Sequence, residues 1–206
     1  MWSADPSRCE RSSLVSERDP PPLFALCSEA DNGAVRVLLG TGGDAALIVL
    51  GLNPSTADQH RSDPTVRRVA AVATGNGFNG FVLANLYPLR ATDPRDLPQQ
   101  ADPRLLAHNQ HCIDALVRAN RERVIWAAWG EGIALRRYLA DSLAALACRL
   151  RPLSCRWIHH GPITRHGHPR HPARLAYRWA FSPFNVQSYV EHLGRNRSAG
   201  GPGDTP

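Results

Sequence analysis

An apolar run of strand length that ends abruptly in small polar residues constrains the fold of this chain more than any other feature. Residues 45–50 read Ala-Ala-Leu-Ile-Val-Leu, and Gly51-Leu52-Asn53-Pro54-Ser55 follows directly. A short continuous apolar run is typical of a strand buried on both faces of a parallel sheet. Pro54 biases Asn53 toward an extended backbone. The sequence therefore predicts that Asn53 and Ser55 are held at the end of a buried strand, where ligands bind in open α/β sheets.

The same transition occurs twice more along the chain. Residues 80–84 are mostly apolar and end in Asn85, and residues 123–128 end in Trp129-Gly130. Segments with helical spacing of apolar residues separate or follow these runs, and a fourth strand is expected near 154–159. The expected helices are at 63–73, 103–117 and 132–147. This alternation predicts a three-layer α/β/α fold with a central, mainly parallel sheet of about four strands and helices on both faces.

A single α/β domain is expected over residues 23–197. Residues 1–22 are polar and Pro-rich and are predicted to be poorly ordered, and 198–206 are predicted to be a disordered tail. Asp31-Asn32-Gly33 predicts a hairpin within 23–39, with antiparallel strands beside the first parallel strand. No apolar run reaches the roughly 20 residues of a membrane span, and the N-terminus does not resemble a secretion signal. A cytoplasmic protein without membrane association is the expectation.

The charge of the chain favours an anionic partner. The formal net charge is +6, and all 24 basic residues are Arg. Arg suits bidentate contacts with phosphate, so nucleic acid or a nucleotide is the predicted partner. A GC-rich coding bias would give the same composition, and net charge alone does not establish nucleic-acid binding.

The cysteine and histidine patterns predict no metal or other cofactor. The 5 cysteines are scattered and contain no C-x-x-C pair, so neither a disulfide framework nor an iron–sulfur cluster is expected. Several histidines crowd between His159 and His171, but zinc sites usually include cysteine or carboxylate ligands, and this stretch has no acidic residue. The segment is predicted to be a loop over the site, with arginines that contact phosphate; a plain basic surface loop is the alternative. These arginines are Arg165, Arg170 and Arg174.

Four short motifs carry a resemblance to a known superfamily. Gly51-Leu52-Asn53-Pro54, the strand ending in Asn85, the strand ending in Trp129-Gly130, and His171-Pro172 resemble, in order, the motifs of the uracil-DNA glycosylase superfamily. Within it, the run Asn-Pro-Ser-Thr-Ala-Asp at 53–58 resembles a bacterial family of unknown function. Residues 63–65 and 167–172 belong to the same resemblance, which extends from about Leu47 to Leu175.

The resemblance implies a uracil-DNA glycosylase-like fold and assigns roles at one site. Asn53 would orient the attacking water, and Asn85 would read the edge of a flipped base. His171 would stabilise the departing base anion, because a fixed donor lowers the energy of developing negative charge. Asn53 and His171 are thus the predicted catalytic residues.

Further residues are predicted to contact the ligand. Ser55 and Tyr87 follow the first two strands and are expected to contact the base, although an aromatic residue at a strand end is more often part of the core. Arg67 and Arg68 stand near a helix start, where positive charge opposes the helix dipole, and this favours a ligand role for one of them, predicted to be Arg67. The predicted phosphate contacts are Arg67, Arg165 and Arg170. Asp63 is expected to cap the helix rather than to take part in chemistry.

Two functions remain open at this point. The first is hydrolysis of the N-glycosidic bond of a flipped or free nucleobase; a neutral Asn53 can orient water but cannot act as a general base. The second is a non-catalytic module that binds a nucleobase, a nucleotide or nucleic acid in the same pocket. A metal-dependent hydrolase built on the histidine segment is a third, weaker hypothesis. His171-Pro172 is followed by Ala173-Arg174-Leu175 instead of the Ser-rich loop typical of glycosylases.

Overall fold

The computed structural model describes residues 24–55 and 62–199. The predicted poorly ordered segment at 1–22 lies outside these residues. The tail predicted from 198 onward also lies outside them, except for residues 198–199, which belong to the last helix.

The described residues contain one mixed sheet of seven strands. Its order is β1-β2-β4-β3-β5-β6-β7. The strands are β1 (Leu26–Ala30), β2 (Val35–Gly40), β3 (Leu47–Gly51), β4 (Phe81–Asn85), β5 (Val124–Ala127), β6 (Arg156–His160) and β7 (Phe181–Pro183). The four strands β4, β3, β5 and β6 pair in parallel, whereas β1, β2 and β7 join antiparallel at the two sides.

This sheet corrects the prediction of about four, mainly parallel strands. The predicted parallel strands form the centre, but half of the strand pairings are antiparallel. The strand β7 escaped prediction because its three residues, Phe-Ser-Pro, show no strand pattern and are mostly exposed. The hairpin of β1 and β2 turns at Asp31–Gly33 as predicted. However, β2 pairs with β4 rather than with β3, because β3 is already paired on both sides, with β4 and β5.

Four α-helices accompany the sheet in the described residues: α1 (Pro64–Gly75), α2 (Pro103–Ala119), α3 (Arg137–Leu150) and α4 (Val186–Ala199). The side chains of Asp63 and Asp102 cap α1 and α2, and a proline follows each cap, as expected from the sequence. The third predicted helix starts later than expected, because residues 130–134 form a separate 3₁₀ turn. None of the helices in the described segments has the length and apolar character needed to cross a membrane.

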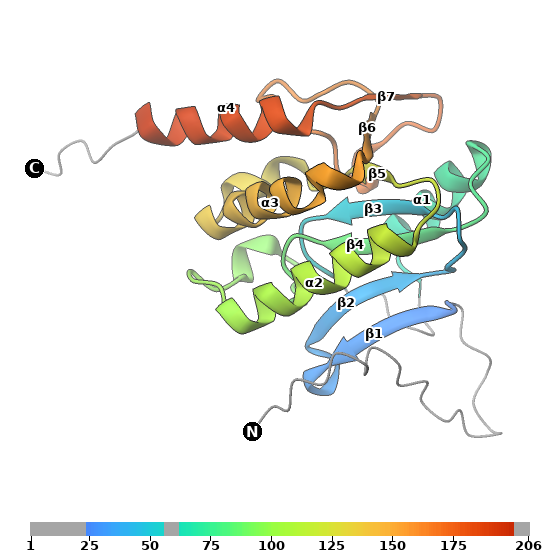
Figure 1. The fold of residues 1–206 in the computed structure, drawn as a ribbon, viewed down its shortest axis with the longest axis horizontal. Helices are drawn as coiled ribbons and strands as arrows, with labels where there is room; N and C mark the ends of the chain where they lie inside the picture. Colours follow the sequence, from blue (N-terminus) through green and yellow to red (C-terminus); the bar gives the residue numbers. More distant parts are fainter. Residues whose placement is uncertain (1–23, 56–61, 200–206) are drawn as a thin grey trace, which may run out of the picture.

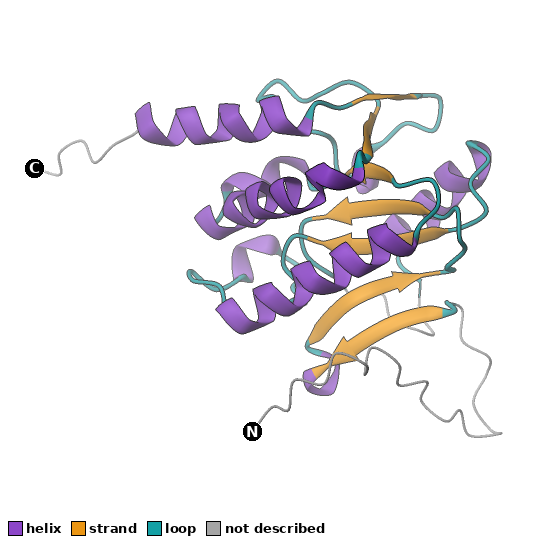
Figure 2. Cartoon of the chain, in the orientation of Figure 1, coloured by secondary structure: helices purple, strands orange, loops and turns teal. Residues whose placement is uncertain are grey.

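The helices cover both faces of the sheet, as predicted. Alternate residues of β3 point to opposite faces. Leu47 and Val49 belong to the apolar cluster that includes the buried face of α1, whereas Ile48 and Leu50 belong to the cluster that includes α2, α3 and α4. Figure 1 shows α2 and α3 running together along the sheet, and Figure 2 shows the same layers by element type. The result is a three-layer α/β/α core whose parallel strands all end at one side.

Candidate functional site

A cavity of about 710 Å³ lies where the parallel strands β3, β4 and β5 end. Sites in open α/β sheets commonly occupy this position, because the loops after the strands diverge there. Most of the predicted site residues line this cavity: Asn53, Ser55, Asn85, Arg165, Arg170 and His171. Residues that are far apart in the sequence thus lie around one cavity at the ends of the strands, as the sequence predicted. Their roles in binding or catalysis stay predictions.

Asn53 is held rigidly at the end of β3. Its side-chain Nδ2 donates to the carbonyls of Pro54 at 3.0 Å and Ala91 at 2.8 Å. An asparagine amide has two N–H donors and one acceptor oxygen. Because two carbonyls take both donors, the Oδ1 atom is the group that Asn53 can offer to a ligand or a water molecule. Asn53 is therefore fixed as an acceptor.

Asn85 presents a buried amide to the cavity. The residue is only 5 % exposed, and its main-chain carbonyl accepts a hydrogen bond of 2.8 Å from Asn109 of α2. Within the described part of the chain, its side-chain amide has no hydrogen-bond partner. Gly51 leaves room for this amide, since a Cβ atom at position 51 would lie 2.7 Å from Asn85 Oδ1. The amide nitrogen and oxygen are not among the fully buried, unpaired side-chain atoms of the described residues. They are open to the cavity, so a donor and an acceptor are available to a ligand.

His171 faces the same cavity in a neutral, donor form. Its Nδ1 accepts a hydrogen bond of 3.2 Å from the backbone N–H of Ala173, and this caps the 3₁₀ turn Pro172–Arg174. Nδ1 therefore carries no proton, and Nε2 carries the N–H of the neutral ring. Burial lowers the pKa of His171, the Asp63 carboxylate opposes this effect, and Arg174 adds to it. The ring can donate from Nε2 without carrying a charge.

Two contacts position the segment that carries His171. Gly130 has a left-handed backbone with φ +68°, and a Cβ atom there would lie 3.1 Å from His171 Cβ. Glycine thus permits the close approach of the two loops. Arg68 of α1 also donates to the carbonyls of Ala173 at 2.8 Å and Pro172 at 3.3 Å. The segment that carries His171 therefore packs against the turn after β5 and is hydrogen-bonded to α1.

A hydroxyl–carboxylate pair completes this side of the cavity. The Ser55 hydroxyl donates to Oδ2 of Asp63, and Oδ1 of Asp63 accepts the backbone N–H of Val66 at 2.8 Å. The predicted capping role of Asp63 is confirmed. Its place in the cavity lining was missed, because a cap at a helix start is a sufficient explanation of an Asp-Pro pair in sequence.

The cavity has more positive than negative side chains. Arg36, Arg165, Arg170 and Arg174 line it together with Asp63 and Glu131. Arg170 is oriented by its hydrogen bond of 2.8 Å to the Pro162 carbonyl and by the Trp179 ring, 5.4 Å away. Arg36 was missed from the sequence, because it lies within the strand β2 and is only 3 % exposed. This charge pattern suits an anionic group on a ligand.

Two predicted site residues lie elsewhere. Tyr87 is 2 % exposed and packs against Tyr138 with ring centroids 5.0 Å apart. Its hydroxyl accepts the backbone N–H of Asp102, so it is a core residue, and the alternative weighed from sequence is the correct one. Arg67 is exposed on α1 and does not line the cavity; it donates to the Ser62 carbonyl at 3.4 Å.

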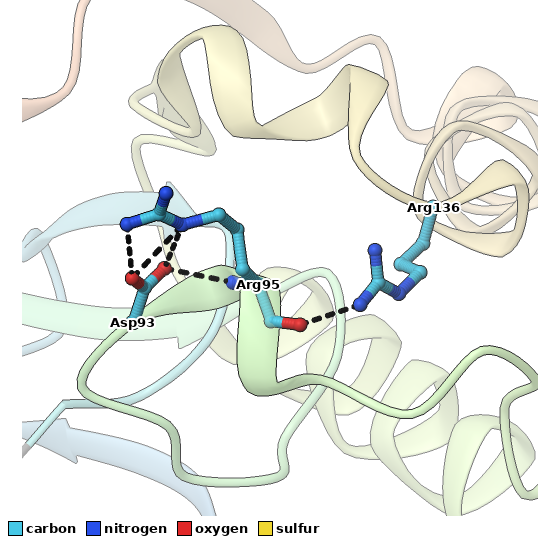
Figure 3. Close-up of polar contacts among 3 residues, drawn as sticks. All are labelled: Asp93, Arg95 and Arg136. Atoms are coloured by element: carbon cyan, nitrogen blue, oxygen red, sulfur yellow. Dashed lines mark hydrogen bonds and ion pairs between the residues drawn. The ribbon is translucent and has the colours of Figure 1, made fainter.

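Another wall of the cavity comes from the loop after β4. Ala91, Thr92 and Pro94 line the cavity. Arg136, which precedes α3, donates to the carbonyl of Arg95 at 2.5 Å (Figure 3) and to that of Leu97 at 2.8 Å. The Arg95 side chain in turn pairs with Asp93 and lowers the pKa of that carboxyl. These contacts fasten the loop to the following helix layer.

The histidines of the 159–171 segment have separate roles. In the described residues, no group of three or more His, Cys, Asp or Glu side chains is arranged to hold a metal. Trp129 donates to the Tyr189 hydroxyl at 3.2 Å, and that hydroxyl lies 2.7 Å from His168 Nδ1. His159 Nδ1 lies 2.8 Å from the Gly161 carbonyl. His160 is buried between Trp126 and Phe181. Nothing in this geometry favours the metal-dependent hydrolase.

Comparison with protein families places residues 36–173 in a family of proteins of unknown function, DUF1643. The match spans more than half of the chain, so the chain belongs to this family. It also contains every residue named above as lining the cavity, except Arg174. A comparison with curated proteins gives no significant match.

Proposed function

We propose that this member of the DUF1643 family binds a nucleobase in the cavity and hydrolyses its N-glycosidic bond. The observation that carries the proposal is the side-chain amide of Asn85, which lines the cavity and has no hydrogen-bond partner among residues 24–55 and 62–199. A side-chain amide offers a donor and an acceptor side by side, which matches the edge of a nucleobase. A ligand that pairs with both atoms uses a donor and an acceptor that the described residues leave unpaired.

His171 supports the hydrolytic part of the proposal. A base that leaves with the electrons of the glycosidic bond accumulates negative charge on its ring. The Nε2–H of a neutral, positioned imidazole stabilises that charge, and backbone capping at Nδ1 fixes the ring in the required form. Asn53 Oδ1 is the acceptor that orients the attacking water, because both Asn53 N–H groups are occupied.

We further infer that the fold is a distant variant of the uracil-DNA glycosylase fold. The inference is supported by the four sequence motifs, whose residues lie around one cavity at the ends of parallel strands. The extra antiparallel strands β1, β2 and β7 are additions at the two sides of this core.

The partner is proposed to be nucleic acid or a nucleotide. A cavity of about 710 Å³ is within the range of small-ligand pockets. The arginines at the cavity, Arg165 and Arg170 among them, suit a phosphate attached to the sugar. The cytoplasm remains the proposed location.

A binding module without catalysis is the second candidate. It is favoured by Asn53, whose neutral amide cannot accept a proton from water. The two candidates share the pocket and differ in whether the base is released.

Base release from defined substrates tests the proposal. The full chain is incubated with oligonucleotides that carry uracil, hypoxanthine, or a G·T or G·U mismatch, and with free nucleosides and nucleotides. Abasic sites and released base are measured alongside binding. Base release that is lost in Asn53→Ala and in His171→Ala supports hydrolysis. Binding without release supports the module, and neither binding nor release overturns both.

A further inference from the structure

We propose that Ser55 and Asp63 form a proton relay that removes a proton from the attacking water, the step that neutral Asn53 cannot perform. The inference rests on the proposed glycosidic hydrolysis and deepens it. It assigns Ser55 as the residue that contacts the water and Asp63 as the proton acceptor that acts through it.

The hydrogen bonds of Ser55 leave its hydroxyl oxygen available only as an acceptor. A serine hydroxyl has one donor and two acceptor lone pairs. The donor is directed to Asp63 Oδ2, so the Ser55 oxygen meets a ligand only as an acceptor. The main chain at Ser55 is fixed by Arg90, whose Nη1 donates to the Ser55 carbonyl at 2.8 Å.

Asn53 and Ser55 together form a cradle for one water molecule. They are two residues apart after β3, and both line the cavity. Asn53 is fixed as an acceptor by its two carbonyl partners, and Ser55 is fixed as an acceptor by Asp63. A water that donates one hydrogen to each keeps its lone pairs free for attack. Neither residue alone fixes both hydrogens.

The proton and electron movements balance in a single hydrolytic step. The water oxygen forms a bond to the sugar carbon, and the bond from that carbon to the base nitrogen breaks with its electron pair on the base. The water proton moves to Ser55 Oγ as the Ser55 proton moves to Asp63 Oδ2. The base anion is stabilised by His171 Nε2–H, and protonated Asp63 later returns its proton to solvent. No metal, oxidant or co-reactant is required.

Asp63 is also electrostatically linked to His171. The carboxylate opposes the effect of burial on the pKa of His171, and both residues line the cavity. A charge change at Asp63 is therefore measurable at His171 without any assay of activity.

The competing explanation is that Asp63 only caps α1. Substitution of Asp63 by Asn separates the capping role from the proton-accepting role. The cap uses Oδ1, which accepts from Val66, and Asn keeps an oxygen for that bond. Asn removes only the charge and the proton-accepting oxygen at Oδ2. Asp102 supplies a matched control, because it caps α2 in the same way and does not line the cavity.

The test compares Asp63→Asn, Ser55→Ala, Ser55→Thr and Asp102→Asn with the wild type on whichever substrate releases base. In Asp63→Asn and Ser55→Ala, kcat should fall about 100-fold or more, with KM changed less than about threefold, as expected for a step-specific loss. Ser55→Thr should retain activity, because it keeps the hydroxyl, and Asp102→Asn should match the wild type. The pKa of His171, followed by NMR, should fall in Asp63→Asn and not in Asp102→Asn.

Two results would overturn the relay, and they are distinguishable. If the wild type releases base and Asp63→Asn does so within about threefold of the same kcat, the relay is wrong while the proposed function stands. If the wild type releases no base from any substrate, hydrolysis and the relay fail together. If the pKa of His171 in Asp63→Asn equals that of the wild type, the electrostatic link between Asp63 and His171 is wrong.

Discussion

The side-chain amide of Asn109 in α2 donates a hydrogen bond of 2.8 Å to the main-chain carbonyl of Asn85 at the end of β4. Asn109 is completely buried. Through this contact a helix of one layer fixes the strand end that presents the Asn85 amide to the cavity. The precision of the site thus depends on a residue that does not line it.

Asn109→Ala is expected to affect both stability and base preference. The loss of a buried hydrogen bond should lower the free energy of unfolding by about 1–3 kcal/mol, measured by urea denaturation. Because the end of β4 becomes less constrained, discrimination among nucleobases should weaken. Asn120→Ala is the matched control, since Asn120 donates to the Ala46 carbonyl at 2.8 Å before β3 begins, away from the cavity. It should lose stability and keep its base preference; equal preference changes in both variants would contradict the prediction.

Gly51→Ala should impair ligand binding more than stability. The new Cβ would lie 2.7 Å from Asn85 Oδ1, and the amide must move to relieve this contact. Because the displaced atom is at the end of a side chain, the fold tolerates the change, but the amide no longer presents the same edge. The affinity for a nucleobase, measured by calorimetry, should fall about tenfold, which corresponds to about 1.4 kcal/mol. Gly75→Ala, which meets no atom within 4 Å, should bind as the wild type does.

Arg170→Ala should weaken binding of all oligonucleotides about equally and reduce the dependence of affinity on salt. Removing one arginine–phosphate interaction reduces the logarithmic salt slope by about one. Asn85→Ala should instead change the preference among bases. Arg67→Ala is the control, because Arg67 is exposed and lies outside the cavity lining. If Arg170→Ala leaves affinity and salt slope unchanged, and the wild type binds no oligonucleotide at low salt, a free nucleotide becomes the better ligand.

Stability should fall as the pH drops below about 6.5, partly through His160. This side chain is 1 % exposed, and burial lowers its pKa from the ordinary value of 6.5. Between the folded and unfolded pKa values, the unfolded chain binds more protons, so the free energy of unfolding decreases with decreasing pH. The slope for one such histidine is at most about 1.4 kcal/mol per pH unit. Denaturation of wild type and His160→Gln between pH 7.5 and 5 checks this, and an identical slope in both would exclude His160 as a source.

Local patterns in the sequence determined most of the secondary structure. The apolar runs that end in Asn53 and Asn85 became β3 and β4, because burial on both faces selects continuous apolar residues. Asp63 and Asp102 cap helices as expected, since capping needs only a side chain and the next backbone N–H groups. Strand ends and helix starts are decided by neighbours in the chain.

The site was predictable where it follows from strand ends and not elsewhere. Asn53, Asn85 and His171 reach one cavity. Tyr87 was misassigned, because whether an aromatic residue after a strand faces the cavity or the core depends on the helix packed beneath it. Arg36 and Asp63 were missed as lining residues, since a strand residue and a helix cap are each explained locally.

The sequence by itself determined that the chain forms parallel strands with polar residues at their ends. Only the tertiary structure decided that β2 pairs with β4 and that Ser55 donates to Asp63. It also decided that the Asn85 amide faces the cavity without a partner from the described residues. The physical reason is the range of the interactions. Periodicity and capping act within a few residues, whereas strand neighbours, burial and hydrogen bonds across the cavity depend on segments that meet only when the layers pack.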